Sequence, residues 1–327
     1  MALPIPKDAR RILPEPLRKL TTEIFQEIGC PKADAGRIAD CLVQVDLRGV
    51  FSHGTRQVRD YVNRYRNGVM ATTPNIRLIR ETDSTAVIDG GAGIGYLAAT
   101  RATEAAIEKV EKHGVAVGAS RYHGHVGSCG IYIRMALEES LVAIAVAGGA
   151  PWGKPSEPEA TVWDAMQAPP MSFGIPSEEG PPLVVDMSTN FFRNQEHMEE
   201  ALKNHAESVL KSMGLMFVST ILGGSLAGFG PDSERDKSYT HAGRGFLIVV
   251  VHPDFVGNAD YLKSEVTRII TSSRELNPLP GFETAEVAGS LEWQRERDWA
   301  KDGIPMADDH LKALEETAGE LGVKVPW

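Results

Sequence analysis

Residues 89–114 read DGGAGIGYLAATRATEAAIEKVEKHG, a glycine-rich turn followed by the apolar periodicity of a long amphipathic helix. Such a turn can bind phosphate, because glycines let backbone N–H groups approach an anion at a helix N-terminus. The glycines at positions 90, 91, 93 and 95 do not have the G-x-G-x-x-G spacing of the dinucleotide fingerprint, and no acidic residue follows at the expected distance. The stretch therefore argues against a fingerprint-type dinucleotide site. It leaves two interpretations, a phosphate cradle or a connection whose glycines allow close packing.

Helical segments come first in the chain and strand-like segments follow. Three helices are expected between residues 15 and 67, because apolar residues recur every three or four positions and glycines stop each helix. Short strands are expected at 76–79 and 85–89, so a domain junction falls between them and the helices. The segment 115–150 predicts a strand, a polar loop, a helix and a strand. The predicted domains are a helical N-terminal part (1–72), a cofactor-binding sheet domain (73–285) and a C-terminal helical part (286–327) that packs with the first.

Composition excludes several classes of function. Of the 327 residues, 42% are hydrophobic, which is enough to bury a substantial core. The formal net charge of −10 leaves no broad basic surface for nucleic acid, so an anionic ligand depends on local arginines. The three cysteines have neither the density of a disulfide framework nor zinc-site spacing, which favours the reducing cytoplasm. No signal-peptide stretch and no apolar run of about 18 residues is evident, so no membrane association is expected.

Residues 47–57, LRGVFSHGTRQ, place His53 between Ser52 and Gly54. Serine and glycine favour a turn, so the imidazole would lie where a substrate can reach it. The simpler interpretation is a solvated loop histidine near two surface arginines, Arg48 and Arg56. The triplet alone does not decide between the two.

A second loop, HGHVGSCG at 123–130, is also rich in polar groups and glycine. His123 and His125 are two residues apart and can point the same way in extended chain, but no HExxH, CxxC or carboxylate pair completes a metal site, and no metal is expected. His125, followed by Gly127 at the mouth of a helix, is expected to face a bound ligand. Asp186 follows an apolar strand, where a carboxylate orients a catalytic histidine or caps the next helix.

These motifs, in this order, resemble the malate/L-lactate dehydrogenase family across nearly the whole chain. The resemblance rests on DLRGVFSHGTR (46–56), STAVIDGGAGIG (84–95), HGHVGSCGIY (123–132), MSFGIP (171–176), LVVDMST (183–189), LKSMGL (210–215) and GFLIVVVHPDF (245–255). It implies an α+β, non-Rossmann fold with a largely antiparallel central sheet domain and a helical domain from the chain ends. It also implies a homodimer that uses NAD or NADP. The implied reaction is hydride transfer between the nicotinamide and a 2-hydroxy acid, a 2-oxo acid or a cyclic 2-imino acid.

The resemblance assigns roles to residues of this chain. His53 matches the family's histidine and would donate a proton in reduction and accept one in oxidation. Asp186 would hold an imidazole in one tautomer and stabilise its charged form. His125 would lie beside the nicotinamide and the reacting oxygen. The implied substrate-binding residues are Arg48, Arg56 and Ser52, since a guanidinium binds a carboxylate bidentately. The implied cofactor-binding residues are His125, Gly127, Thr189 and Lys211.

Several positions depart from the family pattern. Gln57 stands where an arginine is common, which displaces the carboxylate contact to Arg56, and Gly124 stands where an asparagine usually precedes the histidine. QAPP at 167–170 replaces G-T-N-P, and the segment 190–211 is shorter than usual. Two functions follow: a divergent dehydrogenase, or a non-catalytic homologue that binds a small ligand or partner in the same cleft. A third, non-redox acid–base chemistry on a hydroxy acid, uses the same histidine.

Overall fold

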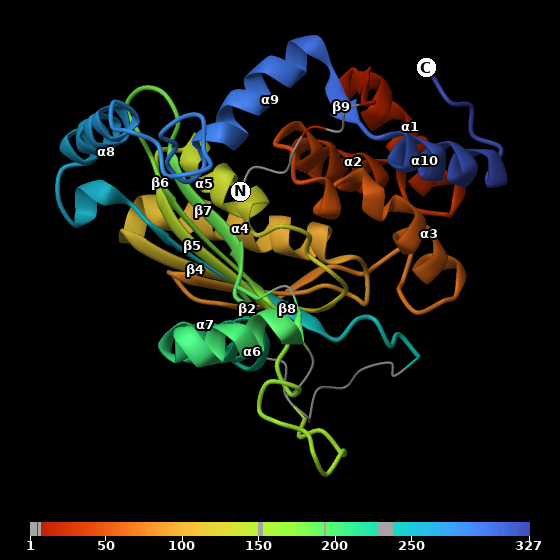
Figure 1. Ribbon diagram of the computed structural model, residues 1–327. Coiled ribbons are helices and arrows are strands. Elements are labelled where there is room, and N and C mark those ends of the chain that lie inside the picture. Colours follow the sequence, from red (N-terminus) through yellow and green to blue (C-terminus); the bar gives the residue numbers. More distant parts are fainter. Residues whose placement is uncertain (1–4, 6–7, 150–152, 193, 228–237) are drawn as a thin grey trace.

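The computed structural model describes residues 5, 8–149, 153–192, 194–227 and 238–327. Its centre is a seven-stranded sheet in the order β2-β3-β4-β8-β5-β6-β7 (Figure 1). The strands are β2 (Arg77–Glu81), β3 (Thr85–Asp89), β4 (Val115–His123), β5 (Val142–Gly148), β6 (Pro170–Ile175), β7 (Leu183–Ser188) and β8 (Arg244–Val251). β3 and β4 pair in parallel, and the other neighbours pair antiparallel. The prediction of a largely antiparallel central sheet is confirmed.

Helices cover both faces of the sheet because its central strands are apolar on both sides. Phe246, Ile248 and Val250 of β8 point into the main core under α4 (Gly95–His113) and α5 (Gly130–Glu138). The alternate residues Leu247 and Val249 belong to a second cluster, under α7 (Ala206–Thr220) and the π-helical turn η3 (Ile221–Leu226). This alternation follows from the two-residue period of a strand.

Segments near the two ends of the chain pack together (Figure 1). β1 (Arg10–Ile12) pairs antiparallel with β9 (Ile304–Met306), and α10 (Asp308–Glu320) packs against α1 (Pro14–Glu27) and α3 (Val58–Arg66). α2 (Lys32–Leu47) contacts both the sheet layer, through α4, and α9 (Ser290–Asp302). The remaining helices are α6 (Gln195–Asn204) and α8 (Ala259–Arg274). The domain boundaries near residues 72 and 285 stay a prediction.

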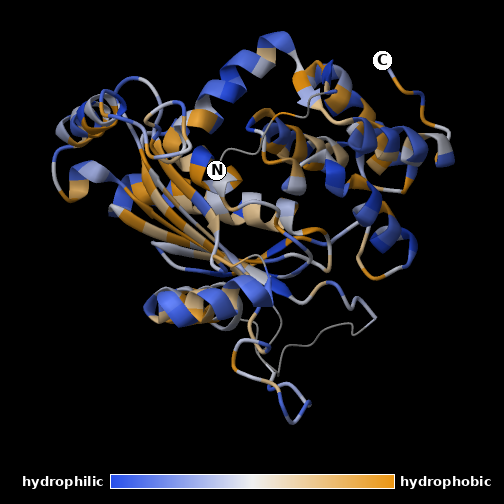
Figure 2. Ribbon diagram, viewed as in Figure 1, coloured by the Kyte–Doolittle hydropathy of each residue, from blue (hydrophilic) through white to orange (hydrophobic). Residues whose placement is uncertain are grey.

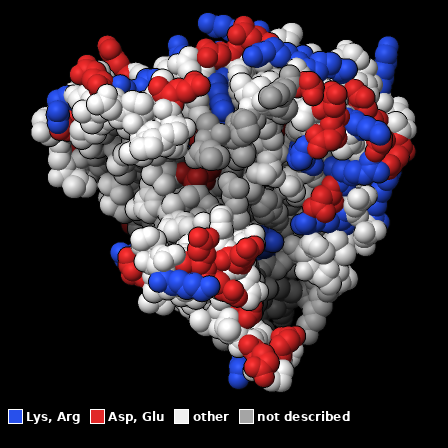
Figure 3. Space-filling view, viewed as in Figure 1, with Lys and Arg blue, Asp and Glu red and all other residues white. Residues whose placement is uncertain are grey.

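Charged side chains of opposite sign are mixed on the surface. Figure 3 shows Lys and Arg interleaved with Asp and Glu over the helices at its right-hand side. Arg59 of α3, for example, pairs with Glu316 and Glu320 of α10 at 3.0 and 2.9 Å. The described residues on this face form no broad basic patch, which agrees with the negative net charge.

One helix is more apolar than the sequence analysis expected. The stretch Ala206–Leu226 has a mean hydropathy of 1.5 and is long enough to cross a membrane, so the expectation of no such run is wrong by length and composition. Figure 2 nevertheless shows hydrophilic and hydrophobic residues mixed along α7, and 39% of the stretch is buried within the fold. Leu215 and Leu222 pack against the sheet. Core helices pass the same test, so the finding is weak evidence for a membrane span.

Candidate active site

Buried polar contacts hold the turn that carries His53. Asp46, at the end of α2, accepts hydrogen bonds from the backbone N–H and the hydroxyl of Thr55, at 2.9 and 2.5 Å. The hydroxyl of Thr55 also lies 3.0 Å from Nε2 of His310 in α10. Gly54 is required here, because a Cβ at this position would lie 1.8 Å from Oδ1 of Asp46. The buried carboxylate beneath the turn therefore requires glycine directly after His53.

The glycine-rich turn after β3 supports the second histidine loop. The N–H groups of Gly90 and Gly95 donate to the carbonyls of Arg121 and His125 at 2.8 and 3.0 Å. A Cβ at Gly95 would lie 2.6 Å from the carbonyl oxygen of Gly124. These donors are already used, and the turn is packed against backbone. Of the two interpretations of this stretch, the structure favours close packing over a phosphate cradle.

His53 and His125 meet at the junction of the two loops, with ring centroids 5.7 Å apart. Nδ1 of His125 lies 2.7 Å from the hydroxyl of Tyr61 in α3. Burial, together with the smaller effects of the positive charges of Arg244, His53 and Arg64, lowers the pKa of His125 to about 3. His125 is therefore a neutral imidazole at pH 7. When Tyr61 donates to Nδ1, Nε2 carries the ring proton and can donate it to a ligand.

Burial also lowers the pKa of His53, while the nearby charge of Asp186 opposes that shift. Nδ1 of His53 lies 2.9 Å from Oγ of Ser52. Asp186 lies within β7, whereas the sequence analysis placed it just past the strand. The carboxylate accepts a short hydrogen bond from Ser128, and a Cβ at Gly130 would lie 2.5 Å from its Oδ2. Glycine at the start of α5 thus allows the carboxylate to approach.

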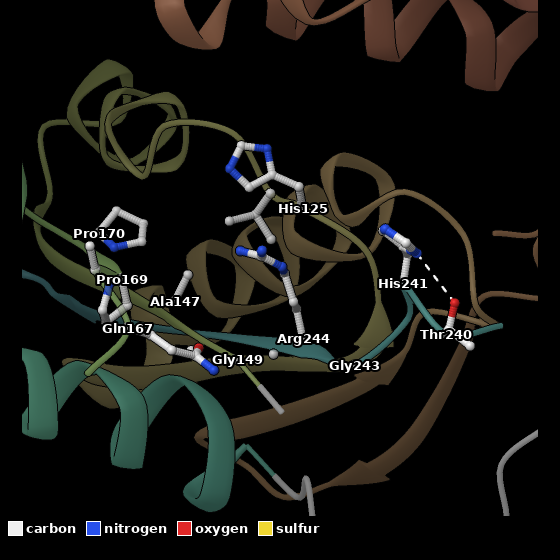
Figure 4. A pocket seen from close by; sticks show the side chains of 14 residues that line it. His125, Ala147, Gly149, Gln167, Pro169, Pro170, Thr240, His241, Gly243 and Arg244 are labelled. Carbon is white, nitrogen blue, oxygen red and sulfur yellow. Dashed lines mark hydrogen bonds between the residues drawn. The ribbon is translucent and has the colours of Figure 1, made fainter. Parts of the chain in front are cut away.

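Two adjoining cavities open at these residues. The first, of about 210 Å³, is lined by Ser52, His53, His125 and Asp186 among others. The second, of about 350 Å³, lies over β5 and β8, with backbone walls at positions 148, 149, 243 and 245. The two share His125, Ala168, Pro170 and Arg244. Figure 4 shows the second cavity, with Arg244 rising from β8 toward His125 and with His241 and Thr240 at one end.

The two arginines predicted to bind substrate lie outside both cavities. Arg48 is 5% exposed and donates from Nε and Nη2 to Glu296 at 3.1 and 2.8 Å. It lines a separate cavity of about 180 Å³ that adjoins the first through Asp186. Arg56 is exposed and pairs with Asp309 at 2.6 Å. Neither guanidinium faces His53 across a shared cavity.

The predicted cofactor residues are spread more widely. Thr189 is buried and donates to the carbonyl of Pro169 at 2.6 Å, so it fixes a wall of the larger cavity without lining it. Gly127 has φ +70°, and a Cβ there would lie 2.4 Å from the ring of Tyr96. Lys211 lies exposed on α7. Of the predicted site residues, the structure brings together Ser52, His53, His125 and Asp186.

Arg244 was missed by the sequence analysis although it lines both cavities. It begins β8 in the segment GRGFLIVVV, flanked by Gly243 and Gly245. An arginine between two glycines at the start of a buried apolar strand is the signal that points to it. Gln167, Thr240 and His241 add polar groups to the larger cavity.

His123, the other histidine of the HGH loop, is a structural residue. It is fully buried, with Nδ1 2.8 Å from the carbonyl of Gly124 and Nε2 2.9 Å from Oγ of Ser120. Burial lowers the pKa of this imidazole to about 4. Within the described part of the chain, no group of three or more His, Cys, Asp or Glu side chains is placed to hold a metal ion.

Comparison with known proteins shows that this chain is similar to one family of dehydrogenases. The family model for malate/L-lactate dehydrogenase matches residues 12–207. The chain is 27% identical over 351 residues to malate dehydrogenase of Pyrococcus abyssi, with 96% of each chain covered. It is 25% identical to ureidoglycolate dehydrogenase (NAD(+)) of Escherichia coli O157:H7, covering 93% of this chain and 95% of that one. The solved structure of malate dehydrogenase from Pyrococcus horikoshii OT3 superposes with a TM-score of 0.82 at 25% identity, with 98% of each chain covered.

Proposed function

The chain belongs to the malate/L-lactate dehydrogenase family, and we propose on this premise that it transfers a hydride between NAD or NADP and a small 2-hydroxy or 2-oxo acid, or a cyclic 2-imino acid. The observation that carries the proposal is the meeting of His53, His125 and Asp186 at one cavity that adjoins a second, larger one. Two cavities side by side suit two reactants. The bound nicotinamide would supply or accept the hydride.

His53 is the proposed proton donor and acceptor. Addition of hydride to a carbonyl carbon builds negative charge on the oxygen, which must then receive a proton. Because burial lowers the pKa of His53, its imidazolium gives up a proton readily and its neutral form is ready to accept one in oxidation. The charge of Asp186 stabilises the imidazolium, and Ser52 lies within hydrogen-bond distance of Nδ1. The neutral His125 would hydrogen-bond to the reacting oxygen.

The larger cavity fits part of a nicotinamide nucleotide. Its volume of about 350 Å³ is within the range of small-molecule sites. Gln167, Thr240 and His241 offer side-chain donors and acceptors, and the glycine backbone lets a planar ring approach closely. We propose that the cofactor lies here, on a largely antiparallel sheet in place of a Rossmann sheet. Gly127 and Thr189 would act by fixing the surrounding loops, and the proposed role of Lys211 rests on the resemblance alone.

The proposal also covers where the protein is located and how many copies of the chain associate. A cytoplasmic location and a homodimer are expected from the family resemblance. Leu210, Val218 and Ile221, on the outside of α7 and η3, are exposed apolar residues available to a second copy. Light scattering of the purified protein at micromolar concentration would give its mass, and a monomer would contradict the homodimer.

The first experiment is a thermal-unfolding assay with NADH and NADPH added separately. A ligand that binds only the folded state stabilises it by about 2.7 kcal/mol at a hundredfold excess over its dissociation constant, so the correct cofactor raises the melting temperature. A screen of 2-oxo acids then follows oxidation of the reduced cofactor as a decrease in absorbance at about 340 nm, where reduced nicotinamide absorbs.

A matched variant separates binding from chemistry. His53→Ala should keep the cofactor-induced shift but lose about 100-fold to 10,000-fold in turnover, the usual contribution of a general acid or base. The exposed His113, at the end of α4, supplies the control His113→Ala. Absence of any shift at millimolar NADH or NADPH would contradict the proposal and favour the non-catalytic alternative.

A further inference from the structure

Arg244 is a cation placed where the two cavities join. Of the four residues that line both cavities, Arg244 carries the charge, since His125 is neutral at pH 7 and the others are alanine and proline. In Figure 4 its side chain extends from β8 into the cavity, with the guanidinium on the side of His125. No ion pair joins this guanidinium to any carboxylate among the described residues.

Neighbouring arginines are already engaged. Arg48 makes two hydrogen bonds to Glu296, and Arg56 pairs with Asp309. Arg134 of α5 donates to the carbonyl of Gly130 at 3.1 Å, and Arg64 pairs with Asp60 at 2.6 Å. Among the described arginines, Arg244 is the one that lines the cavity of His53, and no described ion pair must break for it to bind an anionic ligand.

We propose that Arg244 binds the carboxylate of the substrate, in place of the arginines expected from the sequence. The inference rests on the proposed function. In a 2-oxo acid the carboxylate carbon is bonded directly to the carbonyl carbon, so the carboxylate anchor must lie close to the proton donor. Arg244 and His53 line the same cavity of about 210 Å³, which meets this requirement. Arg48 and Arg56 do not line it.

The start of β8 fixes the backbone from which the Arg244 side chain extends. Arg244 pairs with His123 of β4 in the sheet register, and a Cβ at Gly245 would lie 2.3 Å from the carbonyl of Gly223 in η3. β8 thus lies between β4 and β5 in the sheet, and η3 packs against its start at Gly245. A guanidinium binds a planar carboxylate through two parallel hydrogen bonds, which selects acids over neutral compounds of the same shape. The positive charge also helps to keep His125 neutral.

The same guanidinium chemistry would serve a phosphate of the cofactor, so the test must separate the two anions. The variant is Arg244→Gln, which keeps a polar side chain and removes the charge, with Arg244→Lys as a partial replacement. The dissociation constant for NADH or NADPH reports the cofactor, and KM for the 2-oxo acid reports the carboxylate. The ratio of kcat/KM for the acid to that for its amide reports the recognition of charge.

We expect Arg244→Gln to raise KM by about 10-fold to 100-fold, as loss of a charge-assisted hydrogen-bond pair does, with cofactor affinity within about twofold of the wild type. The preference for acid over amide should fall by a similar factor, and Arg244→Lys should recover part of it. Arg59→Gln removes an arginine of α3 that is paired on the surface and should leave KM unchanged.

Three results with the variants of Arg244 and Arg56 would overturn the inference, besides the oxamate result below: an unchanged KM in Arg244→Gln, a loss confined to cofactor affinity, or a larger rise in KM for Arg56→Gln. Binding of oxamate, an unreactive isostere of a 2-oxo acid, gives a reading independent of turnover. Calorimetry should show weaker oxamate binding to Arg244→Gln than to the wild type, and equal binding, including none by either, contradicts the inference. A wild type that binds oxamate through Arg244 but neither NADH nor NADPH would instead contradict the proposed function.

Discussion

At the scale of single residues, His53 combines partial burial with a nearby carboxylate, and the two have opposite effects. Burial lowers its pKa, and Asp186 raises it by a smaller amount. Reduction needs the imidazolium as a proton donor, whereas oxidation needs the neutral imidazole as an acceptor. The direction of the pKa shift therefore determines how the two reactions depend on pH.

We expect kcat/KM for reduction to fall as the pH rises through a pKa below the ordinary histidine value of 6.5, and kcat/KM for oxidation to rise through the same pKa. Asp186→Asn removes the charge that favours the imidazolium, so both curves of kcat/KM against pH should move to lower pH. Initial rates at about ten pH values between pH 4.5 and pH 9 would define the two curves. Curves that do not move in Asp186→Asn would show that this carboxylate does not act on the proton donor.

Asp46, beneath the same turn, has a pKa raised by burial to about 7, although its hydrogen bonds to Thr55 oppose the shift. Its folded pKa lies above the unfolded value of 3.8, so the folded state binds more protons between these two pH values. The contribution to stability is fully present below pH 3.8 and is lost as the pH rises to about 7. The full change is on the order of 4 kcal/mol.

Asp46→Asn cannot ionise, so its free energy of unfolding should fall less between pH 4 and pH 7 than that of the wild type, by roughly 1–4 kcal/mol. Urea unfolding at a series of pH values measures this difference. Asp60→Asn changes an exposed carboxylate of α3 and should leave the pH dependence parallel to that of the wild type. Parallel curves for Asp46→Asn as well would mean that Asp46 titrates normally in the folded protein.

At the scale of elements, local patterns predicted much of the fold. The three N-terminal helices and the β4-loop-α5-β5 segment lie where periodicity and glycine stops placed them, and the strands expected at 76–79 and 85–89 are found at 77–81 and 85–89. α8 was not predicted, because it buries only two of its apolar residues, Val266 and Ile270, whereas α9 lies within the helical part predicted for 286–327. β1 and β9 are three residues each, and their pairing joins positions almost 300 residues apart.

In the candidate site, too, local patterns predicted some residues, and residues that depend on long-range contacts were missed or misassigned. His53 and His125 stand in loops whose turn residues are visible in the sequence, and the structure brings the two together. Arg48 looked available because its partner, Glu296, is 248 positions away. The two glycines beside Arg244 mark it in the sequence, but the cavities it lines are formed by segments far away in the chain, so the sequence alone did not place it in the site. Long-range partners decide which charges remain available, and a single sequence does not contain them.

The packing of η3 on β5 offers a test at this scale. A Cβ at Gly223 would lie 2.4 Å from backbone atoms of Ala147 and Gly148, so Gly223→Ala must push η3 away from the strand. We expect a loss of about 1–3 kcal/mol in the free energy of unfolding, typical of overpacking. Weaker cofactor binding should accompany it, because Gly148 and Gly149 line the larger cavity.

Gly214→Ala in α7 is the matched control for this substitution. A methyl group added at Gly214 would meet no other atom within 4 Å, and alanine is the better helix former, so the protein should gain up to about 1 kcal/mol. Thermal unfolding and the cofactor dissociation constant distinguish the two variants. Equal free energies of unfolding for Gly223→Ala and Gly214→Ala would show that η3 shifts away from β5 without loss of stability.

At the scale of the whole molecule, the C-terminus reaches the candidate site through buried contacts. The ion pairs between Arg59, Arg66 and Glu320 are about half exposed, and such pairs contribute roughly 0–1 kcal/mol each. In contrast, His310 and Leu311 of α10 are almost fully buried, and His310 lies against Thr55 two positions from His53. The buried contact, and not the surface pairs, therefore couples α10 to the turn.

His310→Ala should lower both stability and activity, because it leaves a cavity beneath the turn and removes one of the two hydrogen-bond partners of the Thr55 hydroxyl, while Asp46 remains. Loss of a buried hydrogen-bond partner costs about 1–3 kcal/mol. We expect the melting temperature to fall and kcat to decrease more than KM rises, since the turn positions the proton donor and not the substrate carboxylate. His310→Gln, which can keep a hydrogen bond to Thr55, should restore part of kcat.

The contrast between kcat and stability decides whether His310 is a positioning residue. If His310→Ala loses stability but keeps kcat at temperatures where it is folded, α10 supports the fold alone. If His310→Gln recovers kcat without recovering the full melting temperature, the hydrogen bond to Thr55 fixes the turn independently of packing. Arg59→Gln, which breaks only surface pairs to α10, should change neither quantity by more than the roughly 0–1 kcal/mol expected for exposed pairs. A large effect of Arg59→Gln would instead place the coupling in the surface ion pairs.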